Sequence, residues 1–434
     1  MKRLLLLAFV FALLILFGGC GSSGHGSVAV DHSTSPTGDD DDSANPNDPS
    51  GDQAADDDLC APVAPPAWPE PDLSDPSTIS YDDQLFFTVN GQRFYPLGFY
   101  NAPSDDAGLA DYKSQGFNIA LTGPGCCDGT SLQDQIDLIH RGQSAGVMMI
   151  LHPWSPIEQV LSRPDDELAA ELAPRDAVGG LFGWYTFDEP GLANVPLSET
   201  DRVHQVLHDY DPTHPDGLVE QTMIPFTHYM ADCAMFMIDP YPIDWMPMSY
   251  FKVTIQQALE AAQYAKPIVG VPQAFSWDWI NGNESAPFHP DATEVRNMIW
   301  QYIIFGASGM VAWNYDGDYT IHEQPDIWAA YLQDIAEIHA LMSVILSDNV
   351  AIDFAAQCAF PETFDYIVKQ DETATWIFSV STNSHGQDVT FDLTPLGKGR
   401  CIVDYTTGEI FGQDDASKVA VHYTGYQVRI LEVK

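Results

Sequence analysis

Two adjacent carboxylates, Asp188 and Glu189, follow an apolar and aromatic run at residues 181–187, and Pro190 comes directly after them. A run of this length and composition predicts a buried strand. In a (β/α)8 barrel, residues at the carboxyl ends of the strands build the active site. A carboxyl group placed there can donate or accept a proton, and a second one can act as base or nucleophile. The motif therefore predicts a carboxylate active site.

The same residues would also suit a helix N-terminus. Acidic side chains are favoured at the start of a helix, and Pro190 would be a good first helical residue. We prefer the catalytic interpretation because an apolar strand that ends in Asp-Glu-Pro is more specific than a cap. Asp188, together with burial by Trp184, Tyr185 or Phe187, would raise the pKa of Glu189, so that Glu189 holds a proton near neutral pH.

Strand-like apolar runs recur between residues 96 and 314 and alternate with amphipathic stretches of helical length. Alternating strands and helices predict a parallel sheet, and eight such strands match a (β/α)8 TIM barrel, an α/β fold. The expected strands are 96–100, 117–122, 147–152, 181–187, 218–222, 234–238, 267–271 and 309–314. The expected helices include 132–145, 199–209, 254–265 and 293–305.

Two smaller features flank the expected barrel. Residues 86–88 and 93–95 enclose Asn90-Gly91, a pair that suits a type I′ turn, and predict a hairpin that plugs the bottom of the barrel. After a helix at 327–346, short alternating runs predict an antiparallel β-sandwich. Its strands are expected at 365–369, 375–380, 388–393, 401–404 and 426–431. We expect the sandwich to brace the barrel, since its one tryptophan, Trp376, is flanked by strand residues.

The N-terminal 78 residues predict export and a tether. Lys2 and Arg3 precede an apolar run at 4–17 that is too short to span a bilayer, as in a signal peptide. The run ends in Leu-Phe-Gly-Gly-Cys, which resembles the bacterial lipobox with Phe17 in place of leucine. This predicts cleavage after residue 19 and lipidation of Cys20, against the alternative of ordinary secretion. Residues 21–78, rich in Ser, Gly, Pro and Asp, predict a disordered acidic tether.

Four segments follow from these assignments: a signal peptide at 1–20, the tether at 21–78, the barrel at 79–346 and the sandwich at 347–434. Position 21, directly after Cys20, is glycine and not the aspartate that retains some lipoproteins at the inner membrane. We therefore expect the outer membrane or cell surface. The net charge of −45, from 62 acidic and 17 basic residues, argues against binding to nucleic acid or to anionic lipid. Membrane attachment is therefore expected through the lipid alone, and the protein is expected to be a monomer.

The seven cysteines favour disulfides over a metal site. With Cys20 set aside, six remain, an even number in an exported chain. We expect Cys358 to pair with Cys401, and the connectivity of the other four stays open. No C-x-x-C pair suggests zinc. His204 and His208 have the spacing of a zinc-protease helix, but Gln205 stands where that chemistry needs glutamate. We therefore expect no metal and no cofactor.

Several motifs together resemble one family. The hairpin, PLGFYN, GFN, the strand that ends in DEP, DPYP and GASGMVAW occur in the order seen in glycoside hydrolases of the cellulase and β-galactosidase clan, from Phe86 to Lys434. The resemblance implies a TIM barrel that cleaves glycosidic bonds. By motif, it implies that Glu189 is the general acid/base and that Trp313 forms the bottom of the subsite that binds the reactive sugar.

One departure from the family pattern concerns the nucleophile, which the clan places as glutamate at the end of the seventh strand. Here Gln273 occupies that place, and an amide cannot act as the carboxylate nucleophile. Asp239 or Asp316 could serve as the base of an inverting mechanism. A 2-acetamido group of the substrate could attack instead, oriented by Asp188, or Glu284 could fold into the site. The rival interpretations are a non-catalytic glycan-binding protein and a structural lipoprotein.

Aromatic residues gather near the expected strand ends and suggest a sugar site, since their faces can stack on pyranose rings. Any single one is better explained by core packing, so the hypothesis rests on their clustering after strands six to eight. His152, near the end of the third strand, could donate a hydrogen bond to a sugar hydroxyl or could equally be a structural histidine. Gln273 is also an expected substrate contact. The expected aromatic contacts are Tyr100, Tyr241, Trp277, Trp313 and Tyr315, and further aromatics nearby are Trp154, Trp245, Phe275 and Trp279.

Overall fold

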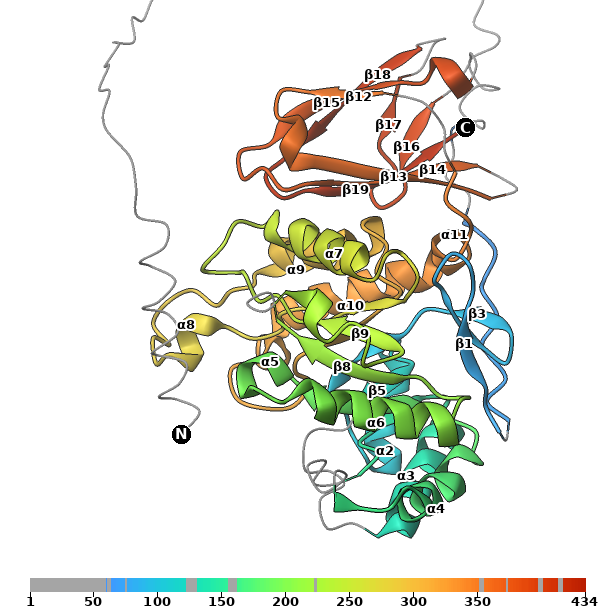
Figure 1. Cartoon of the computed structure of the whole chain (residues 1–434). Helices are drawn as coiled ribbons and strands as arrows, with labels where there is room; N and C mark the ends of the chain where they lie inside the picture. Colours follow the sequence, from blue (N-terminus) through green and yellow to red (C-terminus); the bar gives the residue numbers. More distant parts are fainter. Residues whose placement is uncertain are drawn as a thin grey trace, which may run out of the picture. The chain divides into compact units, whose positions relative to one another are not determined.

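The computed structural model describes residue 60 and residues 64–434, apart from 75, 122–130, 155–161, 222–224, 351–354, 372–373, 397–400 and 413–416. Eight parallel strands close into a barrel (Figure 1), so the predicted TIM barrel is confirmed, and each predicted strand is present. In barrel order the strands are β4 (Leu97–Tyr100), β5 (Ile119–Leu121), β6 (Met148–Leu151), β7 (Leu181–Asp188), β8 (Asp216–Glu220), β9 (Met235–Ile238), β10 (Ile268–Gly270) and β11 (Gly309–Ala312), and β11 pairs back onto β4.

Helices connect the strands as the alternation of patterns predicts. Capping boxes fix the starts of two helices. Ser131 and Asp134 form the box before the helix that begins at Leu132, and Asp291 and Glu294 form the box before the helix that begins at Ala292. The longer helices are α2 (Asp106–Ser114), α3 (Leu132–Ala145), α4 (Asp165–Asp176), α6 (Leu197–Tyr210), α7 (Tyr250–Ala261), α9 (Ala292–Ile304) and α10 (Pro325–Ala340). The short ones are α5 (Pro190–Ala193), α8 (Trp277–Ile280) and α11 (Met342–Ile345). None of the described helices is both long and apolar enough to cross a membrane.

Both faces of the barrel strands are buried, which explains why the strands read as continuous apolar runs. In β6, Met148 and Ile150 belong to the cluster inside the barrel, whereas Met149 and Leu151 pack in the layer between the strands and the helices. In β7, Tyr185 belongs to the interior cluster and Trp184 to the outer layer. The alternation of side chains thus decides which residues can reach an active site at the barrel mouth.

The predicted hairpin closes the amino end of the barrel, as expected. It consists of β2 (Phe87–Val89) and β3 (Gln92–Phe94), and an unpredicted strand, β1 (Ile79–Tyr81), adds to its edge. Asn90 and Gly91 have φ values of 51° and 85°, as a type I′ turn requires. The ring of Phe87 packs edge-on against Phe182, near the start of β7, with 5.1 Å between centroids. The hairpin therefore lies opposite the strand ends that carry the carboxylates.

The C-terminal residues form the predicted antiparallel sandwich. One sheet contains β12 (Ala356–Cys358), β15 (Gln387–Asp392) and β18 (Lys418–Tyr423). The other contains, in spatial order, β13 (Phe364–Gln370), β14 (Thr375–Ser381), β19 (Val428–Val433), β16 (Ile402–Asp404) and β17 (Ile410–Phe411). Strands β12, β17 and β18 were not predicted. Trp376 is fully buried, and its indole N–H donates to Asp371, so it is a core residue.

The sandwich packs against α9, the helix before the eighth barrel strand. The side-chain amide of Asn297 donates to the carbonyls of Ser381 and Tyr426, at 2.9 and 2.7 Å. The rings of Trp300 and Phe378 meet edge-on, with 5.4 Å between centroids. These contacts are of the kind that a bracing role requires.

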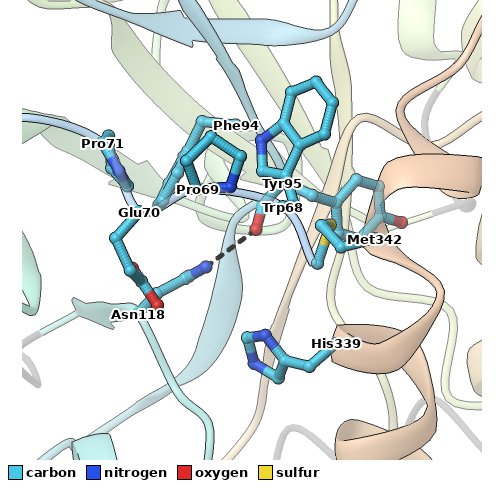
Figure 2. Close-up of a pocket in the computed structure, with 9 residues that line it drawn as sticks. All are labelled: Trp68, Pro69, Glu70, Pro71, Phe94, Tyr95, Asn118, His339 and Met342. Carbon is cyan, nitrogen blue, oxygen red and sulfur yellow. Dashed lines mark hydrogen bonds between the residues drawn. The ribbon is translucent and has the colours of Figure 1, made fainter. Parts of the chain in front are cut away.

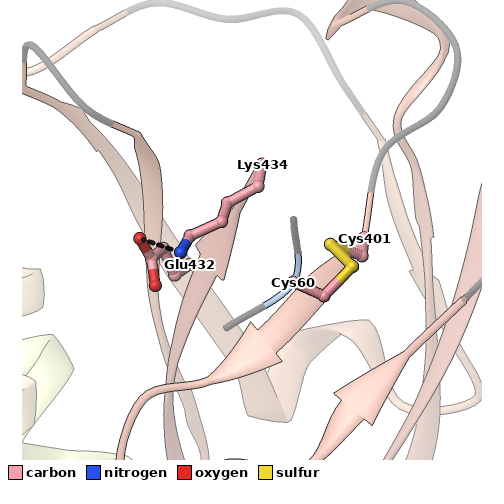
Figure 3. Close-up of a disulfide and its surroundings, with 4 residues drawn as sticks. All are labelled: Cys60, Cys401, Glu432 and Lys434. Atoms are coloured by element: carbon pink, nitrogen blue, oxygen red, sulfur yellow. Dashed lines mark ion pairs between the residues drawn. A yellow bond between two sulfur atoms is a disulfide. The ribbon is translucent and has the colours of Figure 1, made fainter. Parts of the chain in front are cut away.

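The disulfide joins Cys60 to Cys401 and not Cys358 to Cys401 (Figure 3), so the predicted pairing is wrong. Cys401 precedes β16 in one sheet, beside the ion pair of Lys434 with Glu432, whereas Cys358 lies in β12 of the other sheet. Cys358 and Cys233 are free thiols. Cys126, Cys127 and the lipidation candidate Cys20 lie outside the described residues.

The end of the expected tether is attached to the barrel instead of being disordered. The indole N–H of Trp68 donates to the carbonyl of Arg93 in β3, at 3.0 Å. Figure 2 shows the small hollow that results, in which the amide of Asn118 donates to the carbonyl of Tyr95. Because Tyr95 and Asn118 precede the first two barrel strands, this hollow is at the amino end of the barrel. It is therefore separate from the carboxylate site. It is lined by Trp68, Pro69, Glu70, Pro71, Phe94, Tyr95, Asn118, His339 and Met342.

Candidate active site

A bulge at the end of β7 sets the direction of the two carboxylates. Tyr185 lies opposite Gly217 of β8, but Asp188 lies opposite Val219, so β7 advances three residues while β8 advances two. The backbone N–H of Glu189 then donates to the carbonyl of Val219, at 3.0 Å. Such bulges redirect side chains and occur often beside active sites. Asp188 is exposed and Glu189 is half-buried.

Glu189 adopts a left-handed backbone conformation, with φ 47° and ψ 57°. This conformation is uncommon for a residue with a Cβ and costs about 1–2 kcal/mol. The surrounding chain maintains it, because the carbonyl of Glu189 accepts hydrogen bonds from the amides of Leu192 and Ala193 in α5. Local strain that the surroundings hold in place is characteristic of functional positions.

A third acidic residue, Glu220, caps the helix that Glu189 was considered to cap. Glu189 occupies the N-cap position of α5 but makes no side-chain capping bond. Instead, the Gly191 amide donates to Oε2 of Glu220, at 2.7 Å, and the Gln221 amide donates to Oε1, at 3.1 Å. The capping explanation therefore applies to Glu220. Sequence reasoning missed this residue, although it too follows an apolar run at the end of a barrel strand.

Asp239, the predicted partner of Glu189, follows β9 and is only 6% exposed. Its Oδ1 has no hydrogen-bond partner. Burial, followed by the negative charges of Glu189, Asp188 and Glu220, raises its pKa well above the usual range. Burial also raises the pKa of Glu220 to about 7, with a smaller contribution from Asp188, while its two backbone bonds oppose the change. The site thus contains four acidic groups whose charges interact.

Hydroxyl groups inside the barrel lead to Asp188. Tyr185 donates to Oδ1 of Asp188, at 3.1 Å, and Tyr100 donates to the Tyr185 hydroxyl, at 3.3 Å. The rings of Tyr185 and His152 meet edge-on, with 5.3 Å between centroids. The structure therefore brings the predicted residues Tyr100 and His152 to the carboxylate cluster.

An aromatic group covers the ends of β9, β10 and β11. Phe275 is buried and meets the rings of Trp313, Trp277 and Tyr241 edge-on, with centroids 4.8, 4.9 and 5.0 Å away. The indole N–H of Trp277 donates to the carbonyl of Tyr241, at 3.0 Å. Three predicted contacts, Tyr241, Trp277 and Trp313, are therefore gathered and partly exposed. Trp245, on the loop after β9, is 49% exposed.

Two predicted substrate contacts are placed elsewhere and are wrong. Tyr315 is buried in the outer layer, where its ring packs against Phe99 and Tyr112 and its hydroxyl donates to Gln115. Gln273 is fully buried. Its Oε1 accepts from the Ile243 amide, at 3.1 Å, and its Nε2 donates to the Phe275 carbonyl, at 3.2 Å. Its amide therefore joins two loops and cannot reach a sugar.

The other candidates for the second catalytic group are less well placed than Asp239. Glu284 is exposed and accepts a hydrogen bond from the Tyr319 hydroxyl. Asp316 is also exposed, directly after the outward-facing Tyr315. Trp154, one of the further aromatics, is buried in the outer layer. Asp239 is therefore the candidate whose charge interacts with Asp188 and Glu189.

One group of described side chains has the spacing of metal ligands, but it lies apart from these carboxylates. His289, Asp291 and Glu294 bring their ligand atoms within 4.8 Å of one another. Their contacts serve another purpose, since Glu294 pairs with His289 at 2.7 Å and Asp291 caps α9. His204 pairs with Asp216 and His208 with Asp209, and the centroids of the two rings lie 6.2 Å apart.

The comparisons with known proteins agree with the fold. No family model matches the sequence, and no curated protein matches it. A solved glycoside hydrolase of family 5 from Bacteroides vulgatus has a TM-score of 0.54 and 12% identity, over 82% of this chain and 93% of that one. An Anoxybacillus alpha-amylase has a TM-score of 0.51 and 11% identity, over 78% and 97%. At this level of identity, the similarity establishes the fold.

Proposed function

We propose that the protein hydrolyses O-glycosidic bonds of an oligo- or polysaccharide by carboxylate acid/base catalysis. The observation that carries the proposal is the position of Glu189 directly after β7 and of the buried Asp239 directly after β9, at the carboxyl ends of both strands. Such strand ends carry the catalytic residues in TIM-barrel enzymes. The family 5 hydrolase and the amylase that share the fold support the reaction class by analogy.

The two carboxyl groups supply complementary roles. Burial and the negative charges of Glu189 and Asp188 raise the pKa of Asp239, so the cluster favours retention of a proton. Glu189 is the more exposed of the two, and we assign it as the acid that protonates the glycosidic oxygen. The C–O bond then breaks, and its electron pair stays on that oxygen. We assign Asp239 as the base: in its ionised form it accepts a proton from the water whose oxygen bonds to the anomeric carbon.

Single displacement by water agrees with the burial and hydrogen bonding of Gln273. A retaining mechanism needs a second carboxylate as nucleophile, and the buried amide of Gln273 is bonded to Ile243 and Phe275. The partly exposed faces of Tyr241, Trp277 and Trp313 provide an apolar surface for the sugar ring. Neither role requires a cofactor.

We further propose that the protein acts outside the cytoplasm, as a monomer anchored by lipid at Cys20. The signal-like run at residues 4–17 and the lipobox-like sequence before Cys20 are the basis for this proposal. The disulfide between Cys60 and Cys401 supports an oxidising compartment. The outer membrane or the cell surface is the proposed location.

The test is hydrolysis of a broad glycan panel by the full chain in detergent. Glu189→Gln should lower the rate by about 10²- to 10⁴-fold on any substrate, since it removes the proton donor. Glu284→Gln, which changes an exposed glutamate bonded to Tyr319, is the matched control and should retain activity. Turnover that persists in Glu189→Gln would contradict the assignment. Glycan binding without turnover in the wild type would indicate a binding protein.

A further inference from the structure

The site contains more acidic groups than the proposed reaction uses. Acid/base hydrolysis needs two carboxyl groups, which we assign to Glu189 and Asp239. Glu220 is engaged by the amides of Gly191 and Gln221. Asp188 remains, exposed beside the other three, with one oxygen held by the Tyr185 hydroxyl. The reaction itself leaves Asp188 without a task.

Lysine and arginine side chains do not balance this charge in the described structure. Among the described residues, the ion pairs of lysines and arginines all join other carboxylates, and Asp188, Asp239 and Glu220 have no such partner. The undescribed barrel segments, 122–130, 155–161 and 222–224, contain no lysine, arginine or histidine. Arg175, which donates to the carbonyl of Pro153, lies in the outer layer against Trp184. A cationic ligand would supply the positive charge that the described lysines and arginines do not bring to Asp188.

The site also contains a buried acceptor that lacks a donor. Oδ1 of Asp239 has no partner, and the residue is 6% exposed. Buried polar atoms are nearly always hydrogen-bonded, so this oxygen lacks the donor that such atoms usually have. An ammonium group supplies three N–H donors together with positive charge. Tyr241, at the same end of the barrel, is partly exposed, and aromatic faces attract cations.

We propose that the sugar bound here carries a protonated amine that pairs with Asp188 and lies within reach of Asp239. The ligand is thus an amino sugar without an acetyl group. This inference rests on the proposed function, because it names the substrate class of the same site. The net charge of −45 agrees with it, since a strongly negative protein attracts cationic ligands.

The test is isothermal titration calorimetry at pH 6 with three trisaccharides that share one linkage. They are the trimers of glucosamine, of N-acetylglucosamine and of glucose. The protein is the full chain in detergent, with Glu189→Gln in every sample so that turnover does not consume the ligand. The glucosamine trimer should bind at least about tenfold more tightly than either uncharged trimer, a difference of about 1.4 kcal/mol. Adding salt should reduce this preference, because the charges become screened.

Asp188→Asn should abolish the preference, whereas Asp166→Asn, an exposed change on α4 that removes the same charge, should retain it. Equal or tighter binding of either uncharged trimer, or no binding of the glucosamine trimer, would overturn the inference. Hydrolysis of a neutral glycan by the wild type without amine preference would remove the inference and leave the proposed function standing. Amine-selective binding without hydrolysis of any glycan would support the amino-sugar inference and contradict the proposed hydrolysis.

Discussion

Glu220 makes the stability of the protein depend on pH in a defined direction. Its side chain is fully buried, and its pKa is raised from 4.5 to about 7, mainly by burial. Because the folded-state pKa is the higher one, the folded chain binds this proton more tightly than the unfolded chain. The resulting stability is fully present below pH 4.5 and is lost as the pH rises through about 7. The difference between the two pKa values corresponds to about 3 kcal/mol.

Glu220→Gln isolates this contribution. Glutamine keeps the shape and one carbonyl acceptor for the Gly191 amide but does not titrate. Relative to the wild type, the free energy of unfolding of the variant should therefore increase by about 3 kcal/mol between pH 4.5 and pH 8. Below pH 4.5 both side chains are neutral, and the difference between the two proteins should stop changing.

The assay is urea unfolding at pH 4.5, 6, 7 and 8 with the disulfide intact. Glu260→Gln, an exposed change on α7, is the matched control and should show a pH-independent difference from the wild type. A difference between Glu220→Gln and the wild type that does not vary with pH would refute the reasoning. So would a variant that loses stability relative to the wild type as the pH rises.

Two further predictions concern the disulfide and the aromatic residues. Cys60→Ser should lower the free energy of unfolding by about 2–5 kcal/mol in urea unfolding, because Cys60–Cys401 closes a loop across 341 residues. Cys358→Ser, which changes a free thiol, should not, and equal losses would contradict the pairing. Trp313→Ala should weaken glycan binding about tenfold, or about 1.4 kcal/mol, by titration calorimetry. Tyr315→Phe should leave binding unchanged and cost about 0.5–1.5 kcal/mol of stability for its bond to Gln115, and weaker binding would place Tyr315 at the site after all.

The barrel was predictable because its strands are buried on both faces. Runs such as Leu181–Asp188 therefore appear as continuous apolar segments bounded by polar residues, and the helices between them show their own periodicity. The sandwich was harder to predict, since short strands such as β17 (Ile410–Phe411) carry too few residues for a pattern. The Asp-Glu-Pro motif located the carboxylate pair because chemistry and strand end coincide there.

The missed details depend on three-dimensional geometry that a linear pattern does not contain. Tyr100 ends β4 and Tyr315 follows β11 closely, but Tyr315 faces the helices and Tyr100 faces the interior. A shift of one residue decides between these faces. Cys60 is 341 residues from Cys401, so no local spacing indicates the pair. Glu220 ends an ordinary strand. Its role as a helix cap becomes evident only from the hydrogen bond that it accepts from the Gly191 amide.

The central claim is that Glu189 and Asp239 act as acid and base in a single displacement. The most direct measurement is proton NMR of the first anomer that the wild type releases from a glycan it hydrolyses, with Asp239→Asn assayed in parallel. The account predicts a product of inverted configuration and no measurable turnover in Asp239→Asn. A product of retained configuration, or an active Asp239→Asn, would contradict it.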